Sequence, residues 1–302
     1  MKISYNIKID TNNQTGIFNP IQTHKYNSFL YDFRTNSKII DDADNNEYEI
    51  LAVSPDLKYV ALVTKEYVKY TNKRFIVQET ATGNIVYKTE KHLVYDAIFS
   101  PKSDYVFTRA YKNNGFCVEI GKDVVIDKFP FSIDPESTIY QNNSCVYPIE
   151  RKSKLIQLSF DTLSFSEIII PDTKECIQQL RADSDDNLYL IDKKFVVRKY
   201  DKELNLLWTV KYAKDEHNFC NYAPHFFVKE SVNLLIYYCP DNNGCYMAQN
   251  LSTGEKLTIQ RKGEWYGAGL IKSVFFDNKV MDSFGQTFDV ITGETELIKG
   301  IF

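Results

Sequence analysis

The residue types best suited to chemistry in this sequence are the cysteines and histidines between positions 217 and 245. Four of them would supply the nitrogen and sulfur ligands that tetrahedral zinc prefers: Cys220, His225, Cys239 and Cys245. Their spacing is irregular, and no two cysteines stand in a CxxC pair. We therefore predict no metal and no cofactor. Zinc, a disulfide between Cys239 and Cys245, and buried cysteines acting as small apolar residues remain the alternatives.

Catalytic residues of other types have weaker support. Ser54 and Ser100 each precede a proline in a turn, where a serine hydroxyl usually bonds the local backbone. The acidic stretches 41–44 and 183–186 contain oxygen ligands that calcium accepts, but neither has the spacing of an EF-hand loop. The sequence contains no GxSxG, HExxH, Walker A or GxGxxG motif. We predict no catalytic residue.

The elements that would position any site are short strands in a repeated pattern. Residues 48–88 read as four β-rich runs separated by turn residues, and residues 95–129 repeat the scheme. Aromatic residues make up 14% of the chain, and together with Val, Ile and Thr they favour strands over helices. The one weak helical candidate is 172–180. The pattern indicates an all-β chain.

Two series of turn landmarks give the period of the repeat. Turns between the first and second runs are expected near Asn13, Asp56, Lys102, Asn142, Asp185, Glu230 and Asn278. Turns between the third and fourth runs are expected near Asn36, Gly83, Gly121, Asp161, Lys202, Gly254 and Gly293. Successive landmarks stand roughly 40–48 residues apart, with one longer step after Lys202, and this period is typical of a four-stranded propeller blade.

Two hairpins carry a resemblance to a known family. Ser54-Pro55-Asp56 and Ser100-Pro101-Lys102, each followed by an apolar run, resemble the first hairpin of WD-repeat-like β-propellers. The Gly-His and Trp-Asp dipeptides of the WD-repeat family are absent. The resemblance implies a seven-bladed β-propeller of four-stranded antiparallel blades, formed as a single domain by residues 1–302.

The first blade is the least regular part of this scheme. Residues 2–9 are either its innermost strand or a strand that pairs with the last blade. Pro20 weakens its second strand, because proline removes a ladder donor. Six or eight blades would follow if this blade were misassigned.

Charge and composition limit the classes of partner that we expect for this chain. The formal net charge is -4 and no basic block is present, whereas nucleic-acid binders usually carry a basic footprint. No window approaches the length of apolar sequence that a membrane helix needs. The N-terminal residues lack the features of an export signal. We therefore expect a monomeric cytoplasmic protein with reduced thiols and no nucleic-acid or membrane partner.

Aromatic residues gather in loops that the scheme places on one face. The connections between blades and the loops between second and third strands share this upper face, and about ten residues are inserted between Val210 and Tyr222. We predict that a partner protein binds there through residues of the hot-spot types: Phe219, Tyr222, Trp265, Tyr266, Tyr67, Tyr70 and Tyr111. The alternative is that these rings are buried beneath their own loops.

The sequence thus favours a non-catalytic interaction module, either a scaffold, an adaptor or an inhibitor of one enzyme. The alternative function is a propeller enzyme or small-ligand binder with a site in the central channel. Such sites are assembled from several blades and leave no linear motif.

Overall fold

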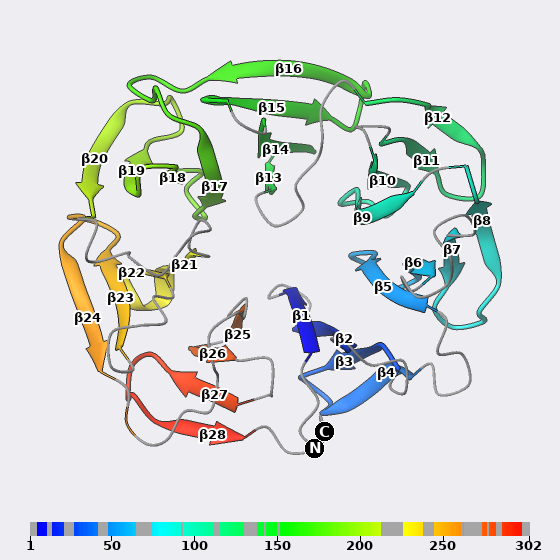
Figure 1. Ribbon diagram of the computed structural model, residues 1–302, viewed down its shortest axis with the longest axis horizontal. Helices are drawn as coiled ribbons and strands as arrows, with labels where there is room; N and C mark the ends of the chain where they lie inside the picture. Colours follow the sequence, from blue (N-terminus) through cyan, green and yellow to red (C-terminus); the bar gives the residue numbers. More distant parts are fainter. Residues whose placement is uncertain are drawn as a thin grey trace. The chain divides into compact units, whose positions relative to one another are not determined.

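The computed structural model describes most of the chain. The described residues are 5–10, 14–20, 27–41, 48–64, 74–91, 93–111, 115–129, 138–141, 143–149, 152–212, 226–237, 245–260, 262, 274–276, 278–281 and 286–297. They form two compact units, one of Met1–Pro135 with Lys299–Phe302 and one of Glu136–Ile298. Each unit is a series of four-stranded antiparallel sheets, numbered here 1 to 7 in chain order (Figure 1).

The first unit contains sheets 1 to 3. Sheet 1 is formed by β1 (Tyr5–Asp10), β2 (Thr15–Pro20), β3 (Phe29–Asp32) and β4 (Ser37–Asp41). Sheet 2 is formed by β5 (Tyr48–Val53), β6 (Tyr59–Thr64), β7 (Phe75–Glu79) and β8 (Ile85–Thr89). Sheet 3 is formed by β9 (Val94–Phe99), β10 (Tyr105–Ala110), β11 (Cys117–Glu119) and β12 (Val124–Ile126).

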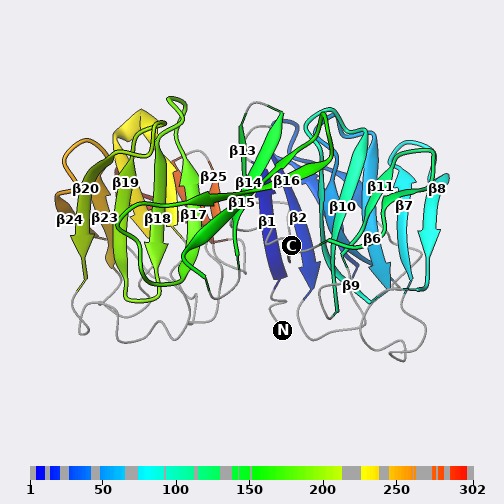
Figure 2. The ribbon, with the colours of Figure 1, turned by 90° about the horizontal axis from the view of Figure 1, so that it is seen from above.

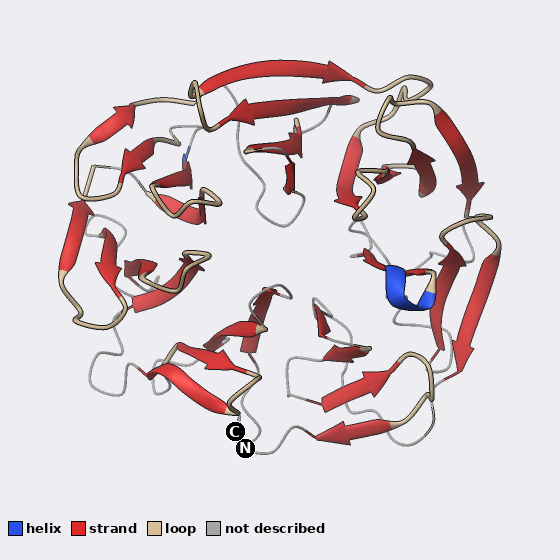
Figure 3. Cartoon of the chain, turned by 180° about the vertical axis from the view of Figure 1, so that it is seen from behind, coloured by secondary structure: helices blue, strands red, loops and turns tan. Residues whose placement is uncertain are grey.

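The second unit contains sheets 4 to 7. Sheet 4 has β13 (Ile139–Gln141), β14 (Ser144–Pro148), β15 (Lys154–Ser159) and β16 (Ser164–Ile169). Sheet 5 has β17 (Ile177–Ala182), β18 (Leu188–Asp192), β19 (Val196–Tyr200) and β20 (Leu206–Lys211). Sheet 6 has β21 (Phe226–Lys229), β22 (Leu234–Tyr237), β23 (Cys245–Asn250) and β24 (Lys256–Gln260), with a 3-10 turn at Glu230–Val232 (Figure 3). Sheet 7 has β25 (Val274–Phe276), β26 (Lys279–Met281), β27 (Gln286–Asp289) and β28 (Thr295–Leu297).

Both series of predicted turns are confirmed where they are described. Each described landmark lies between the two strands that it was expected to join, from Asp56 between β5 and β6 to Gly293 between β27 and β28. Asn13 and Asn142 lie outside the described residues. Gly83, Gly121, Gly254 and Gly293 all have φ between 73° and 77°, the left-handed conformation that only glycine adopts without a steric cost.

Residues 5–10 are the first strand of sheet 1. They pair with β2 over six residues, and Pro20 ends that ladder opposite Tyr5, where its missing donor costs little. The weak helical candidate 172–180 was wrong: it covers a turn and the beginning of β17. The apolar residues of β17 are buried in the core that sheets 4 and 5 share, and this burial favours a strand.

The second and fourth strands of a sheet run the same way, as β6 and β8 show in Figure 2. Loops from second to third strands and connections between sheets therefore lie at one end of the strands, which we call the upper end. The first-to-second and third-to-fourth turns lie at the lower end. The upper end corresponds to the upper face that the sequence predicts as the binding face.

Cores lie between successive sheets within each unit. In the first unit, buried residues of β6 and β7, including Phe75, pack against buried residues of β9, β10 and β11, including Val106, and against Phe116, which precedes β11. The rings of Phe75 and Phe116 meet edge to face, with centroids 5.9 Å apart. In the second unit, Tyr189 and Val197 of sheet 5 pack against Phe226 and Leu235 of sheet 6. Each sheet thus buries an apolar face against its neighbour.

Hydrogen bonds of buried polar side chains accompany these cores. The Asn19 side chain donates to the Ile50 carbonyl oxygen at 2.8 Å and accepts from the Ile50 amide at 3.1 Å, which fastens sheet 1 to the first strand of sheet 2. In the second unit, the Tyr189 hydroxyl donates to the Asp183 carboxylate at 2.8 Å. The hydroxyl of Tyr147 is also buried, but it has no hydrogen-bond partner among the described residues.

This contrast between two buried tyrosines is testable. We expect Tyr147→Phe to leave the free energy of unfolding unchanged or to raise it by up to about 1 kcal/mol, because an unpartnered polar group is removed. Tyr189→Phe should lower it by about 1–2 kcal/mol, because Asp183 loses a donor. Urea denaturation of the two variants measures both effects, and equal losses would contradict the assignment.

Candidate binding site

Of the predicted partner-binding residues, Tyr111 is the one within the described part of the chain. It follows β10 at the upper end of sheet 3, and 54% of it is exposed. Its role in partner binding stays a prediction. The other six residues lie outside the described residues: Tyr67, Tyr70, Phe219, Tyr222, Trp265 and Tyr266.

Tyr111 forms an exposed aromatic pair with Tyr95. The two rings meet edge to face, with centroids 6.4 Å apart and planes at 71°. Tyr95 is 44% exposed. The Tyr111 amide donates to the Leu93 carbonyl oxygen at 2.9 Å, which fixes the backbone beside Tyr95. Each ring therefore restricts the other while both keep a face open to solvent.

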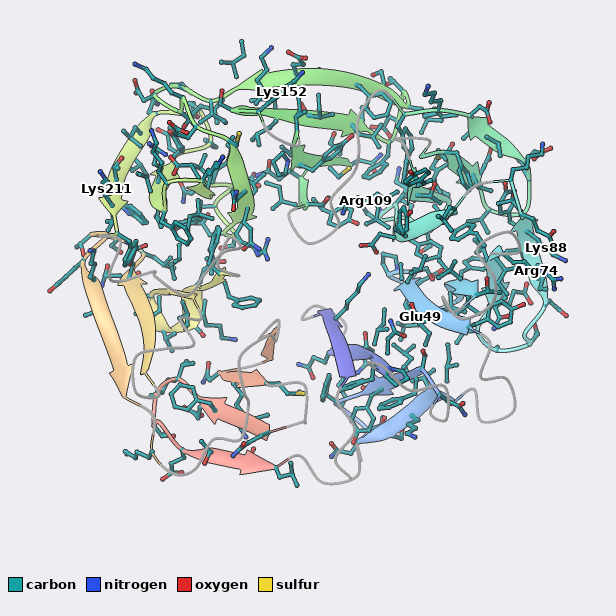
Figure 4. All side chains as sticks on the ribbon, viewed as in Figure 1. Glu49, Arg74, Lys88, Arg109, Lys152 and Lys211 are labelled. Carbon is teal, nitrogen blue, oxygen red and sulfur yellow. The ribbon has the colours of Figure 1, made fainter. Side chains whose placement is uncertain are left out.

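A β-bulge in sheet 3 produces this pair. Arg109 lies opposite Asp96, whereas Ala110 lies opposite Val94, so Tyr95 is the extra residue of β9. A bulge bends a strand and redirects a side chain, and here it turns an aromatic ring of a first strand outward. The half-buried side chain of Arg109 lies beside β9 (Figure 4).

Charged side chains from three sheets meet beside the bulge. The Lys8 ammonium on β1 lies 2.6 Å from the Asp96 carboxylate on β9 and donates to the Leu51 carbonyl oxygen on β5 at 3.1 Å. The side chains of Lys8 and Asp96 are 25% and 15% exposed. Lys8 therefore links the first strands of sheets 1, 2 and 3.

Arg109 has no ion pair or hydrogen bond from its guanidinium to any described residue. Because Lys8 and Asp96 pair with each other, Arg109 adds one positive charge beside the bulge. A guanidinium presents donors in a planar fork that matches a carboxylate. The arrangement of Tyr95, Tyr111 and Arg109 suits a partner segment with an acidic side chain beside an apolar one.

The serine and aspartate candidates are engaged in turns. The Ser54 hydroxyl donates to Asp56 at 2.7 Å and accepts from the Tyr59 amide at 2.9 Å. Ser100 repeats the arrangement with Asp104 and the Tyr105 amide. The prediction that these hydroxyls cap the local backbone is confirmed. In the stretch 183–186, the Asp183 carboxylate accepts from Asp185 and Asn187 of its own turn.

Most of the candidate metal ligands lie outside the described residues. Cys220, His225 and Cys239 lie outside them, and only the backbone of Cys245, at the start of β23, is described. Within the described part of the chain, no group of three His, Cys, Asp or Glu residues is arranged to hold a metal. Cys117, Cys145 and Cys176 are free thiols.

Comparisons with known proteins define the fold. No protein-family model matches the chain, and no curated protein matches it. A Kluyveromyces lactis Hsv2 variant with loop 6CD replaced by a Gly-Ser linker has a TM-score of 0.68 at 8% identity, covering 98% of both chains. The β-propeller domain of Cps50 (Swd1) from Myceliophteria thermophila has a TM-score of 0.56 at 11% identity, covering 97% of this chain and 95% of that one.

The fold is a WD-repeat-like β-propeller. Its seven sheets correspond to the seven predicted blades. A third similar structure is the dihydro-heme d1 dehydrogenase NirN in complex with DHE, with a TM-score of 0.53 at 14% identity. It covers 85% of this chain and 65% of that one. None of the described helical segments of this propeller has the length and hydropathy needed to cross a bilayer.

Sequence reasoning missed Lys8, Asp96, Tyr95 and Arg109. A signal for two of them exists, because Asp96 is the single charge in the first strand of blade 3 and Lys8 lies between two isoleucines in the first strand of blade 1. A charge in such a strand requires a partner, and the blade scheme places first strands side by side. Tyr95 carries no comparable signal, because the sequence does not show the bulge.

The Lys8–Asp96 pair should contribute to stability. We expect Asp96→Asn to lower the free energy of unfolding by about 1–3 kcal/mol, because it leaves the largely buried Lys8 ammonium without the carboxylate that pairs with it. The control Lys154→Met removes an exposed pair with Glu167 and should cost no more than about 0.5 kcal/mol. Urea midpoints measure both, and a loss for Asp96→Asn no greater than that of the control would refute a stabilising role.

Burial also predicts the reactivity of two thiols. Desolvation raises the pKa of Cys145 to about 12 and raises the pKa of Cys117, so both remain neutral at pH 8.5, where an ordinary thiol is substantially ionised. We expect iodoacetamide at pH 8.5 to leave both unmodified in the folded protein and to modify both in urea. Peptide mass spectrometry identifies the modified residues, and rapid native labelling of Cys145 would contradict this burial.

Proposed function

We propose that this propeller is a non-catalytic protein-interaction module, a scaffold, adaptor or inhibitor, that binds a partner protein through its upper end. The proposal treats residues 1–302 as one domain and as a monomer. The partner-binding residues are Tyr111 with Tyr95 and Arg109, together with the predicted Tyr67, Tyr70, Phe219, Tyr222, Trp265 and Tyr266.

The observation that carries the proposal is the exposed Tyr95–Tyr111 pair beside Arg109. Tyrosine and arginine are enriched among residues that dominate binding energy. The two rings already restrict one another, so they would lose little side-chain entropy when a partner covers them. The Arg109 guanidinium is unpaired among the described residues, so a partner that places an acidic group beside it would bind in preference to one that does not.

Two further observations fit a module that works by binding. The hydroxyls of Ser54 and Ser100 are engaged with aspartates in turns, where they are buried and stabilise hairpins. The free thiols of Cys117, Cys145 and Cys176 suit a reducing compartment such as the cytoplasm.

Affinity capture tests the proposal. We expect the wild-type protein to retain a stoichiometric protein partner from native lysate, and Tyr95→Ala combined with Tyr111→Ala to lose it. Arg109→Gln should weaken capture and reduce its dependence on salt, because it removes a charge. Quantitative mass spectrometry of the retained proteins supplies the measurement.

A matched control separates binding from folding. Tyr140 is 47% exposed and lies on Phe160 with ring centroids 6.4 Å apart, but it precedes a lower-end turn of blade 4. Tyr140→Ala should therefore retain the partner. Equal loss in both tyrosine variants, or retention by the Tyr95/Tyr111 variant, would count against the upper-end site.

The alternative is an enzyme or small-ligand binder that uses charged residues of the first strands. The Lys8–Asp96 pair with Arg109 is the observation that favours it, because it places three ionisable groups on adjacent elements. Under this alternative no protein is captured in any sample, and Arg109→Gln abolishes binding of an anionic small ligand while the tyrosine variants retain it.

A further inference from the structure

A cavity lies at the lower end of the first unit, away from the residues proposed above to bind a partner. It is a groove of about 550 Å³ that is open to solvent, and it lies between the fourth strand of blade 1 and two turns of blade 2. Its lining residues are all described: Ile39, Leu57, Lys58, Tyr59, Glu79, Thr80 and Ala81. The volume is within the range of pockets that bind small ligands or peptide side chains.

Two unusual backbone features place aliphatic residues in this groove. Leu57 has φ of 60°, a left-handed conformation that is costly for a bulky side chain. At the corresponding turn of five other blades the left-handed residue is polar: Gln14, Ser103, Asn143, Asp186 and Asn233. Blade 2 alone among these described turns has an apolar residue there.

Ile39 is placed by a bulge in β4. Leu30 lies opposite Ile40 and Tyr31 opposite Lys38, so Ile39 is the extra residue of the strand. It is 37% exposed. Bulges commonly redirect a side chain at a sheet edge. Strained or irregular backbone that exposes apolar side chains is a reasonable sign of function.

One polar atom of the groove has no partner. The Thr80 hydroxyl oxygen is buried and makes no hydrogen bond to any described residue, whereas the Thr80 amide donates to the Lys58 carbonyl oxygen at 2.8 Å. A buried hydroxyl without a partner is costly, and a ligand that bonds to it removes that cost. The groove therefore offers aliphatic surface together with one hydrogen-bonding group.

The charges and the neighbouring strand edge define the occupant. Both charges of the lining are engaged by residues outside it, since the Lys58 ammonium lies 3.3 Å from the Asp56 carboxylate and Glu79 accepts from the Thr82 hydroxyl at 2.5 Å, so the groove favours an uncharged group. The ladder of β4 pairs with β3 on one side, and no described strand pairs with its other side. An extended peptide can bond to such an edge while a side chain enters an adjacent pocket.

We propose that this groove is a second binding site, which takes an uncharged aliphatic residue of an extended partner segment. The aliphatic side chain contacts Ile39 and Leu57, and a peptide group of the segment bonds to the Thr80 hydroxyl. This site shares no residue with the Tyr95–Tyr111 pair. It lies at the lower end of the strands, whereas the pair lies at the upper end.

The test uses a capped dipeptide, N-acetyl-leucyl-leucinamide, as the probe. We expect millimolar probe to shift the methyl signals of Ile39 and Leu57 in the methyl-labelled full chain, in a saturable way. N-acetyl-glutamyl-glutamide should shift them at least tenfold more weakly. Absence of a shift with the leucine probe would overturn the proposal, and equal shifts with free leucine would indicate a small-molecule site instead of a peptide site.

Variants separate binding from folding. Leu57→Asn introduces the residue of the corresponding turns of blades 4 and 6, so the urea midpoint should not fall while probe affinity falls at least fivefold. Leu163→Asn, at another left-handed leucine outside the groove, should leave affinity unchanged. Thr80→Val should weaken the probe severalfold with a midpoint that is unchanged or higher, and unchanged affinity in both groove variants would refute the assignment.

Discussion

The structure depends on one constraint: a four-stranded sheet with two apolar faces cannot be stable alone in water. Each described blade resolves this by burying a face against a neighbouring blade of its unit, as Phe75 and Phe116 do between blades 2 and 3. The strands are therefore apolar along much of their length instead of alternating strictly. Polar groups inside the stack need hydrogen-bond partners, and Asn19, bonded to both backbone groups of Ile50 in the neighbouring sheet, is the clearest case between sheets.

The same constraint explains where recognition features occur. The faces of the blades are committed to packing, so surface for a partner remains at strand ends, at bulges and along fourth strands. Tyr95 and Ile39 are both the extra residues of bulges, one in a first strand and one in a fourth strand. Leu57 is in a turn whose backbone conformation is itself unfavourable for leucine. At Tyr95, Ile39 and Leu57, a departure from the regular repeat thus accompanies an apolar side chain at a proposed binding site.

The repeat could be predicted from the sequence because period and turn chemistry are local properties. Asp56, Gly83 and Gly121 mark turns through their own conformational preferences, and no distant contact is needed to recognise them. The bulge at Tyr95 depends on register between two strands, which neither strand specifies by itself. The Lys8–Asp96 pair joins residues 88 positions apart, so its recognition required the three-dimensional stacking of blades. The position of Tyr111 at the upper end could be predicted because it follows directly from the repeat.

Every described sheet consists of four consecutive strands, and no sheet combines strands from distant parts of the chain. Hydrogen-bonded ladders therefore join near neighbours in sequence, which keeps the contact order of strand pairing low. A ribosome releasing this chain would deliver each blade as a complete hairpin series before the next one emerged. Because a nascent blade lacks the neighbour that covers its second face, a blade that is followed by another in its unit is prone to aggregate only until the next forty or so residues have been synthesised.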